Sequence, residues 1–362
     1  MTQRRAGATM VPRDVPARRI GMREVARAAG VSVSTVANVL SRPSIVAPAT
    51  RRRVEAVIES VGYVPNGPAR QLRGRPSPIV ASVTLDLANP FYAEVNRGIE
   101  DELAEHGCLV LACSTDLRPA KERQLLKLLQ TQAVRGVIIA PVGTDPAPLL
   151  WMSQHGMAVV LIDHPRAGLD LCAVAVDDVA GGRLAGEHLV GLGHRRIAFL
   201  GGTRDAGPVA RRRDGVRKAL AAAGLDPATG LLDVRVPLHP PPLVEAAASA
   251  AALILAATPP VTAVVCLNDT AALGLLDGFA AAGVRVPADI SVVGYDDLPF
   301  ARRLAPALTT VSQPKYRLGR AAAELLLDEA RPGHVHREIG FRPTLAVRAS
   351  TAPPSDASKR ID

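Results

Sequence analysis

The sequence predicts a small all-α domain of the helix-turn-helix type, followed by a large α/β core built on parallel sheets. Two observations support this architecture. Between residues 22 and 61, apolar side chains recur at three- and four-residue steps, which is the spacing of one helical face. From residue 79 onward, short apolar runs alternate with amphipathic stretches, as strands and helices do in a parallel sheet. With 362 residues, 48% of them hydrophobic, the chain can fill more than one core.

Two consecutive helices are expected within residues 22 to 41. The first covers residues 22 to 29, and Gly30 ends it because glycine readily adopts the left-handed conformation of a tight turn. Ser32 then caps the second helix. The two helices pack together through an apolar set that consists of Met22, Val25, Ala26, Ala29, Val36, Val39 and Leu40.

This packing leaves Val33, Ser34 and Asn38 on the outer face of the second helix, where the major groove of DNA can receive them. A third helix follows, with Pro48 in its first turn and Gly62 at its end. Three helices within about 45 residues match the size of a small DNA-binding module.

The positive charge of the chain is concentrated at the same end. Residues 1 to 77 contain fourteen arginines and four acidic residues, whereas the remainder is nearly neutral. Arginines that neutralise phosphates release counterions, so this distribution favours a polyanion such as DNA as the partner. A solvated basic segment is the alternative that charge alone leaves open.

Four short motifs of this region occur in a specific order and spacing. They are Glu24-Val-Ala-Arg-Ala-Ala-Gly-Val-Ser, Thr35-Val, Thr50-Arg-Arg-Arg-Val and Gly62-Tyr-Val-Pro-Asn. Through them the chain resembles the lactose- and galactose-repressor family of bacterial transcription regulators. The resemblance implies a homodimer that binds pseudo-palindromic operator DNA and responds to a small-molecule effector, most simply as a repressor. The residues expected at the DNA are Ser32, Val33, Ser34, Thr35, Asn38 and Arg51, with Arg52 and Arg53 facing phosphates or solvent.

Residues 66 to 75 are expected to form a short hinge helix. About two turns of helix are too short to be stable alone in water, so the segment should order only when something holds it. In the family that the chain resembles, this segment folds on the operator, pairs with its dimer mate and inserts a leucine into the minor groove. That leucine matches Leu72; the alternative is an ordinary linker in which Leu72 packs on the core. The other hinge residues expected at the DNA are Asn66, Ala69, Arg70 and Arg73.

These observations divide the chain into five parts. They are a disordered basic arm (1–19), the helix-turn-helix domain (20–65), the hinge helix (66–75), a two-lobed effector-binding and dimerisation core (78–349) and a disordered tail (350–362).

The core is predicted to contain two sheets because of the number of its strands. Strands are expected at residues 79–84, 108–113, 136–140, 158–162, 173–176, 197–200, 232–236, 263–266, 291–293 and 309–312. Helices are expected at residues 92–105, 120–132, 181–190, 212–223, 244–257, 270–282 and 315–329. The pattern resembles the type I periplasmic-binding-protein fold, two Rossmann-like lobes with a cleft between them. The resemblance implies that the chain crosses between the lobes near Val176, Leu304 and Arg337, and that the final strands return to both lobes.

Polar side chains follow several of these strands. Asp163, Asn268 and Asp296 come shortly after strand ends, and Phe91 and Tyr92 follow the first strand after a turn. Because ligands bind beyond the carboxyl ends of parallel strands, we expect these groups to converge on the cleft. Paired acceptors suit neighbouring hydroxyls and an aromatic ring suits the apolar face of a sugar, which favours a sugar-like ligand.

The resemblance matches six positions to the effector pocket of the family: Phe91, Tyr92, Asp163, Arg212, Asn268 and Asp296. An acidic residue after a strand can instead cap the next helix, and Asp269 is interpreted mainly in this way. The segment Leu238-His-Pro-Pro-Pro-Leu lacks the aromatic residue that relatives carry in the pocket. The identity of the effector therefore stays open, with a purine or another non-sugar metabolite as the alternative to a sugar.

Neither a catalytic centre nor a metal or cofactor site is expected. The nucleophile motif G-x-S-x-G and the phosphate-binding motif G-x-x-x-x-G-K-S/T are absent, and the histidines are scattered. An α/β enzyme would need a reactive constellation in the cleft. The four cysteines lie in apolar runs and are interpreted as buried thiols of a reducing compartment: Cys108, Cys113, Cys172 and Cys266.

A cytoplasmic protein is expected from the absence of an apolar run long enough for a secretion signal or a membrane span. A two-lobed solute-binding protein for transport is the rival interpretation of the core. It would need an export signal, and it has no use for a basic three-helix domain.

Overall fold

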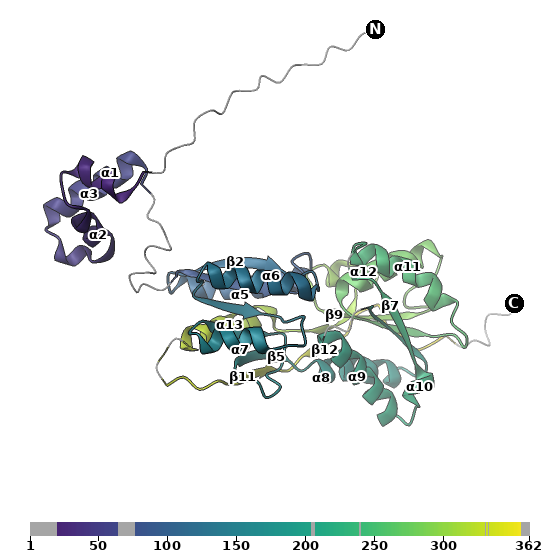
Figure 1. Cartoon of the computed structure of the whole chain (residues 1–362). Helices are drawn as coiled ribbons and strands as arrows, with labels where there is room; N and C mark the ends of the chain where they lie inside the picture. The colour runs from purple at the N-terminus through teal and green to yellow at the C-terminus, as the bar shows by residue number, and fades with distance from the viewer. Residues whose placement is uncertain are drawn as a thin grey trace, which may run out of the picture. The chain divides into compact units, whose positions relative to one another are not determined.

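The structure is a computed structural model, and it divides into two units between Pro76 and Ser77 (Figure 1). It describes residues 20–63, 77–203, 207–238, 240–329, 331 and 333–355. The predictions made for the arm and the hinge lie outside the described residues, including those for Asn66, Ala69, Arg70, Leu72 and Arg73.

The first unit contains the three predicted helices. They are α1 (Met22–Ala29), α2 (Val33–Ser41) and α3 (Pro48–Val61), with a short 3₁₀ helix, η1 (Pro43–Ile45), between the last two. A single apolar core joins them, and it consists of Val25, Ala26, Ala29, Val36, Val39 and Val54.

Local chemistry explains where these helices begin and end. Gly30 and Gly62 both adopt φ of 62°, the left-handed conformation that ends a helix and that side chains disfavour. At the start of α2 the hydroxyl of Ser32 accepts the backbone N–H of Thr35 over 3.1 Å. Pro48 opens α3 in the first turn, where a missing N–H costs nothing. The helix-turn-helix prediction is confirmed.

The second unit contains two six-stranded sheets, one in each lobe. The sheet of the first lobe has the order β11-β5-β4-β3-β1-β2, and all its pairings are parallel. Its strands are β1 (Ile79–Thr84), β2 (Leu109–Ser114), β3 (Gly136–Ile139), β4 (Ala158–Ile162), β5 (Cys172–Val176) and β11 (Glu338–Phe341). Its helices are α5 (Pro90–Ala104), α6 (Pro119–Thr131), α7 (Ala147–Gln154) and α13 (Lys315–Glu329).

The sheet of the second lobe has the order β12-β10-β9-β8-β6-β7, and β12 alone is antiparallel to its neighbour within this sheet. Its strands are β6 (Ile197–Gly202), β7 (Leu231–Val236), β8 (Ala263–Cys266), β9 (Ser291–Asp296), β10 (Thr309–Ser312) and β12 (Thr344–Ala346). Its helices are α8 (Asp178–Gly191), α9 (Gly207–Ala222), α10 (Pro227–Gly230), α11 (Leu243–Leu255) and α12 (Asp269–Ala281), and the short η2 (Ala301–Arg303) follows β9.

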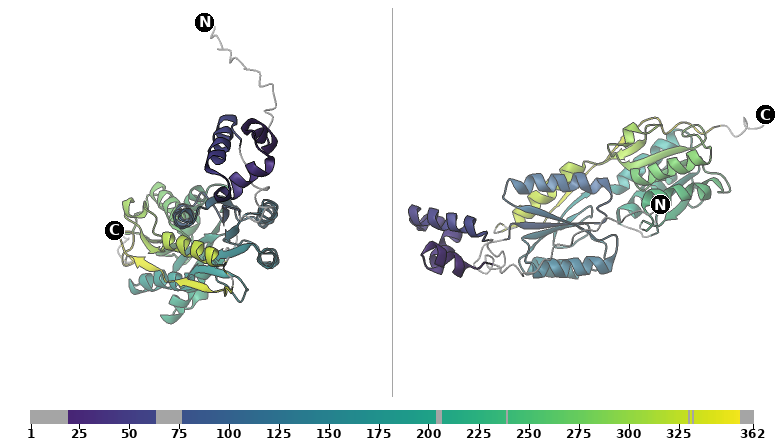
Figure 2. Two further views of the ribbon diagram at one scale, coloured as in Figure 1. Left: turned by 90° about the vertical axis from the view of Figure 1, so that its left-hand side faces the viewer. Right: turned by 90° about the horizontal axis from the view of Figure 1, so that it is seen from above.

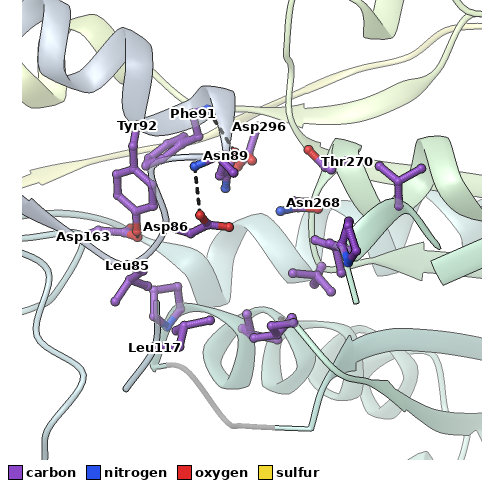
Figure 3. A pocket seen from close by; sticks show the side chains of 18 of the residues that line it. Leu85, Asp86, Asn89, Phe91, Tyr92, Leu117, Asp163, Asn268, Thr270 and Asp296 are labelled. Carbon is purple, nitrogen blue, oxygen red and sulfur yellow. Dashed lines mark hydrogen bonds between the residues drawn. The ribbon is translucent and has the colours of Figure 1, made fainter. Parts of the chain in front are cut away.

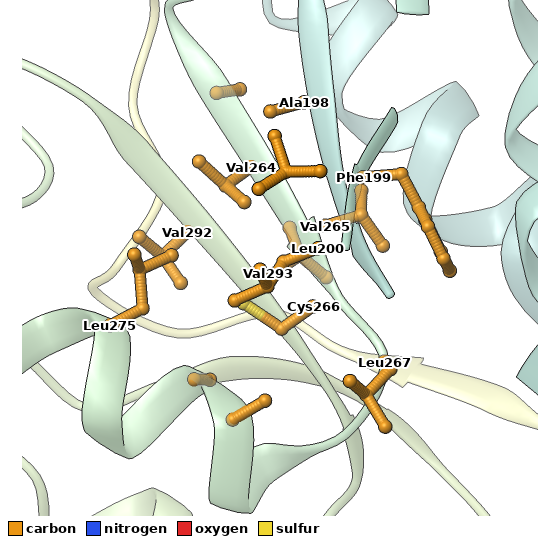
Figure 4. Close-up of a cluster of buried hydrophobic side chains, with 14 of the residues drawn as sticks. Ala198, Phe199, Leu200, Val264, Val265, Cys266, Leu267, Leu275, Val292 and Val293 are labelled. Carbon is orange, nitrogen blue, oxygen red and sulfur yellow. The ribbon is translucent and has the colours of Figure 1, made fainter. Parts of the chain in front are cut away.

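Helices cover both faces of each sheet (Figure 2). In the first lobe, α5 and α13 pack on one face through a cluster that includes Val95 and Leu318. On the other face, α6 and α7 pack through a cluster that includes Leu126 and Leu149. In the second lobe the strands β6, β8 and β9 supply the buried centre, in which Phe199 and Val264 have no exposed surface (Figure 4).

The chain passes between the lobes three times. The first crossing follows β5 at Asp177, close to the position expected near Val176. The second lies between β10 and α13, not near Leu304, and the third lies between β11 and β12, not near Arg337. The two expected positions are wrong because Leu304 precedes a strand that still pairs within the second lobe, and Arg337 precedes a strand that still pairs within the first.

Two further predictions need correction. Cys113 is half-exposed rather than buried, because β2 is the edge strand of its sheet. Residues 350 to 355 are described by the structure, and Ser350 is fully buried: its hydroxyl accepts the N–H of Thr309 over 2.8 Å and donates to the carbonyl of Val292 over 2.6 Å. The predicted disordered tail is therefore wrong for these six residues.

No helix among the described residues combines the length and the apolar character that a membrane crossing requires.

Candidate functional site

The outer face of α2 presents the side chains predicted to meet DNA. Val33 is 40% exposed, Ser34 is exposed and Asn38 is half-buried. The Ser32 hydroxyl lies 2.7 Å from that of Ser34 and 2.8 Å from that of Thr35. These contacts hold the start of the helix in shape, and they leave the amide of Asn38 one turn further along the same face.

Helix α3 carries three consecutive arginines in its first half. Arg51 is half-buried and pairs with Glu55 over 3.8 Å, one helical turn away. Arg52 and Arg53 are exposed. An ion pair of this kind between exposed groups is weak, so Arg51 can exchange its partner for a phosphate at little cost.

A cavity of about 370 Å³ lies between the two lobes of the second unit (Figure 3). This volume suits a small-molecule ligand. All six residues predicted for the pocket line it: Phe91, Tyr92, Asp163, Arg212, Asn268 and Asp296. The structure thus brings together side chains from both lobes that are as many as 205 positions apart in the chain, from Phe91 to Asp296.

Phe91 and Tyr92 enter the cavity from the first turn of α5. The carbonyl oxygen of the Asn89 side chain caps this helix by accepting the N–H of Phe91 over 3.0 Å. The two rings meet edge to face with centroids 5.0 Å apart. The Tyr92 hydroxyl donates to Asp163 Oδ2 over 3.2 Å, and burial first, then Asp163, raises the pKa of Tyr92 well above its usual value. Tyr92 therefore stays a neutral donor.

Asp163 follows β4 with φ of 56°, a left-handed conformation that turns its side chain toward the cavity. Its Oδ1 is buried and has no hydrogen-bond partner among the described residues. Burial, and next the charge of Asp178, raise the pKa of Asp163 to about 7. The carboxyl thus titrates near neutral pH and lacks one donor.

Arg212 reaches the cavity from α9 and is buried. Its Nε–H donates to Asp178 Oδ1 over 2.9 Å and its Nη1 donates to the carbonyl of Leu267 over 2.7 Å. The guanidinium lies 3.7 Å from the centre of the Tyr295 ring. Burial lowers the pKa of Arg212, but the neighbouring acidic groups, Asp178 foremost, raise it by more, so the side chain stays charged.

Asp296 closes the opposite side of the cavity at the end of β9. Its Oδ1 accepts the side-chain N–H of Gln313 over 2.7 Å, whereas Oδ2 is buried without a partner among the described residues. Arg212 Nη1 lies 4.0 Å from Oδ1. Burial raises the pKa of Asp296 to about 7, although Arg212 opposes the shift. Asp296 and Asp163 therefore share one property, an unsatisfied buried oxygen.

Asn268 lines the cavity as predicted, but the cap of α12 is Asn268 and not Asp269. Asn268 caps α12 by accepting the N–H of Ala271 over 2.8 Å, and it also lines the cavity. Asp269 is not the cap: it is fully buried and accepts the N–H of Leu298 over 2.7 Å and the hydroxyl of Thr310 over 2.6 Å. Leu298 packs in the core of the first lobe, so Asp269 holds a loop that joins the lobes.

Sequence reasoning missed several residues of this site. Asp178 pairs with both Arg211 and Arg212, and it follows β5 by the same strand-end rule that identified Asp163. A buried arginine also demands a carboxylate partner, which was a usable signal. The apolar wall gave no signal of its own, and it consists of Leu85, Leu117, Pro208, Val209, Leu238, Pro242, Leu243, Val244 and Leu267.

Among the described residues, no group of three or more histidine, cysteine or acidic side chains is arranged to hold a metal ion. His239, in the segment that lacks the pocket aromatic of relatives, lies outside the described residues.

Comparison with known proteins identifies both units. Residues 21–66 match the model of bacterial regulatory proteins of the lacI family, and residues 187–351 match a periplasmic binding protein-like domain. The HTH-type transcriptional repressor PurR of Photobacterium profundum is 32% identical over 335 residues, which cover 91% of this chain and 98% of that protein.

Solved structures share the fold. The lac repressor dimer bound to operator and the anti-inducer ONPF has a TM-score of 0.77 at 27% identity, covering 92% of this chain and 100% of that one. A LacI family transcriptional regulator from Enterococcus faecium with bound ribose has a TM-score of 0.70 at 30% identity, covering 76% of this chain and 99% of that one.

Proposed function

Since this chain belongs to the lacI family of bacterial regulatory proteins, we propose that its interlobe cavity binds the effector that controls the affinity of its first unit for operator DNA. The chain is a DNA-binding transcription regulator with a small-molecule effector, not an enzyme, and it acts as a dimer on DNA. We assign it to the cytoplasm, where bacterial operator DNA lies, and to repression as its simplest mode.

The recognition surface is α2. Val33, Ser34 and Asn38 supply an apolar contact, a hydroxyl and an amide on its outer face. An asparagine amide pairs best with the N6 and N7 edge of adenine, so Asn38 directs each half-site toward adenine. Around them, Ser32 and Thr35 hold the start of the helix against the DNA backbone. Arg51, Arg52 and Arg53 contact phosphates.

The hinge, residues 66 to 75, is the second DNA contact. We assign Leu72 to the minor groove and place Arg70 and Arg73 near phosphates, with Asn66 and Ala69 completing the segment. An apolar wedge unstacks a base step and bends the duplex, which lets both half-sites of a dimer engage. The family membership of the whole chain supports this role.

The observation that carries the effector assignment is the convergence of Asp163, Arg212 and Asp296 on one cavity. Phe91, Tyr92 and Asn268 complete the set. Carboxylates that accept from hydroxyls, beside an aromatic pair, are suited to a sugar or a sugar derivative. The Enterococcus relative with bound ribose supports that class.

Switching follows from the placement of the cavity between lobes. A ligand that contacts Asp163 in the first lobe and Asp296 in the second stabilises one separation of the lobes over another. Only such a difference in affinity can shift a conformational equilibrium. The lobe spacing in turn sets the distance between the two hinges of a dimer, and with it the affinity for the operator.

The test begins with the full-length protein and a random pool of duplexes, from which the bound sequences are selected and their affinity measured. Candidate effectors are then screened by thermal shift, because a ligand at 100 times its dissociation constant adds about 2.7 kcal/mol. Asp296→Asn should abolish the response of operator affinity to the effector, whereas Asp277→Asn, an exposed carboxylate on α12, should keep it. If no duplex is preferred over random competitor at low salt, the proposed function fails.

A further inference from the structure

The cavity has two chemically distinct parts, and this limits the ligand it accepts. Eleven of its nineteen lining residues are apolar, contributed by both lobes. Leu85 and Leu117 lie on the side of the cavity away from Asp296 and Thr270 (Figure 3). A ligand that fills the whole volume therefore meets both polar groups and aliphatic side chains.

The polar residues of the cavity need hydrogen-bond donors from the ligand. Three buried side-chain oxygens of the cavity lining lack a partner among the described residues: Asp163 Oδ1, Asp296 Oδ2 and Thr270 Oγ1. The two carboxylate oxygens can be satisfied only by a donor. Leaving such oxygens unsatisfied is costly, and a ligand hydroxyl can supply the missing donor to each. An ionised phosphate or carboxylate offers only acceptors, so it would leave both oxygens unsatisfied.

The charges around the cavity also disfavour an anion. Among the described residues that line the cavity, Arg212 is the one basic side chain, and its charge is already met by Asp178 at 2.9 Å and by Asp296 at 4.0 Å. Arg211, just outside the lining, is paired with the same Asp178 over 2.9 Å. An anionic ligand would have to compete with these carboxylates and face Asp163 and Asp296 at close range.

The apolar part is built into the fold. Leu238 packs against Gly202 at the end of β6 so closely that a side chain at position 202 would lie 2.8 Å from Leu238 Cδ1. Leu243 and Val244 begin α11 and add to the same wall. A ligand made only of hydroxyls would bury polar groups against this wall without hydrogen-bond partners, which is costly, whereas a ring or alkyl group buries against it favourably.

Building on the proposed function, we propose that the effector is a neutral molecule that bears hydroxyls at one end and an apolar ring or alkyl group at the other. The hydroxyls bind Asp163 and Asp296, and the apolar group packs against the wall formed by Leu238, Leu243 and Val244. Free monosaccharides and phosphorylated sugars are the classes that this cavity selects against.

Matched probe sets test this by calorimetric titration of the full-length protein. One set is glucose, phenyl β-glucoside and glucose 6-phosphate; the other is ribose, adenosine and adenosine 5′-phosphate. In the set with the preferred hydroxyl arrangement, the substituted neutral probe should bind roughly tenfold or more tighter than the free sugar. The phosphorylated probe should bind more weakly than its neutral counterpart.

Two variants separate the parts of the cavity. Leu243→Asn should weaken the substituted probe by roughly tenfold and leave the free sugar within about twofold. Its matched control is Leu253→Asn, a leucine of the same helix that is 61% exposed and outside the cavity, which should change neither. Asp163→Asn should weaken every hydroxylated probe, since its amide nitrogen cannot accept the ligand's donor.

Tighter or equal binding of the phosphorylated probe or the free sugar overturns the proposal, and so does failure of both substituted neutral probes to bind. Operator affinity measured in the same samples separates the two hypotheses. A sugar phosphate that binds and changes operator affinity leaves the proposed function standing and this inference refuted. A substituted neutral probe that binds without changing operator affinity supports this inference and refutes the proposed function.

Discussion

Arg212 and Asp178 form a buried ion pair beside the cavity, in which Nε–H donates to Oδ1 over 2.9 Å. The pair links α9 to α8, two helices of the second lobe that glycines allow to approach closely. A side chain on Gly182 would overlap the carbonyl oxygen of Arg212. The position of the arginine in the cavity thus depends on a carboxylate and a glycine of another helix.

Removing this carboxylate should be costly. Asp178→Ala leaves a buried guanidinium without its main partner, so we expect the free energy of unfolding to fall by about 3 kcal/mol or more. Denaturation in urea measures the change. Asp214→Ala is the control: it breaks a pair with Lys218 between half-exposed side chains over 2.9 Å and should cost under about 1 kcal/mol. Equal losses for the two variants would contradict the importance of burial.

Stability should depend on pH through Asp163. Its pKa is raised by burial from 3.8 to about 7 in the folded protein. A carboxyl whose pKa is raised on folding contributes stability that is complete below the unfolded pKa and is lost as the pH rises through the folded value. Between pH 5 and pH 8 the unfolding free energy of the wild type should therefore fall more steeply than that of Asp163→Asn. Curves that run parallel for the two proteins would argue against this titration.

Asn38 should determine one base pair in each half-site. Asn38→Ala should reduce discrimination at that position by about 1–3 kcal/mol, measured by competition between duplexes that differ there alone. Arg52→Ala is the matched comparison, since Arg52 is exposed on α3. It should weaken binding to all duplexes alike and reduce the salt dependence by about one phosphate contact per protomer. A uniform loss for Asn38→Ala would assign that residue to the backbone instead.

The hinge hypothesis predicts a separation of two activities. Leu72→Ala should weaken operator binding, because the wedge that holds the bent duplex is lost, while effector affinity measured by calorimetry stays unchanged. Leu40→Ala, a half-buried core position of α2, should instead lower the melting temperature of the first unit. Unchanged operator affinity in Leu72→Ala would contradict the hinge hypothesis.

Local signals explain what could be predicted from the sequence. Gly30, Ser32 and Gly62 mark helix ends by conformation or capping, which neighbouring residues alone determine, and each does so in the structure. The ten strands listed from apolar runs all occur within a few residues of their expected bounds. The strand-end rule then brought Asp163 and Asp296 to the cavity without knowledge of the sheet order.

Long-range relations explain what could not be predicted. β11 and β12 lack continuous apolar runs, because they are short edge strands with half-exposed residues. Helix α8 begins at Asp178 rather than Gly181, since its glycines serve the approach of α9 instead of weakening the helix. The apolar wall around Leu238 has no motif: its members lie in separate loops and helices that only the fold assembles.

The last segments of the chain return to both lobes, and this order affects how the protein is completed during synthesis. Helix α13 and strand β11 complete a lobe that the chain began at Ile79, yet they follow nearly the whole second lobe in sequence. A ribosome must therefore deliver residues beyond 338 before the first lobe has its outermost strand. Nascent chains released early would lack both β11 and β12, so neither lobe would be finished, and a truncated regulator carrying an intact DNA-binding head would have no complete sensor attached to it.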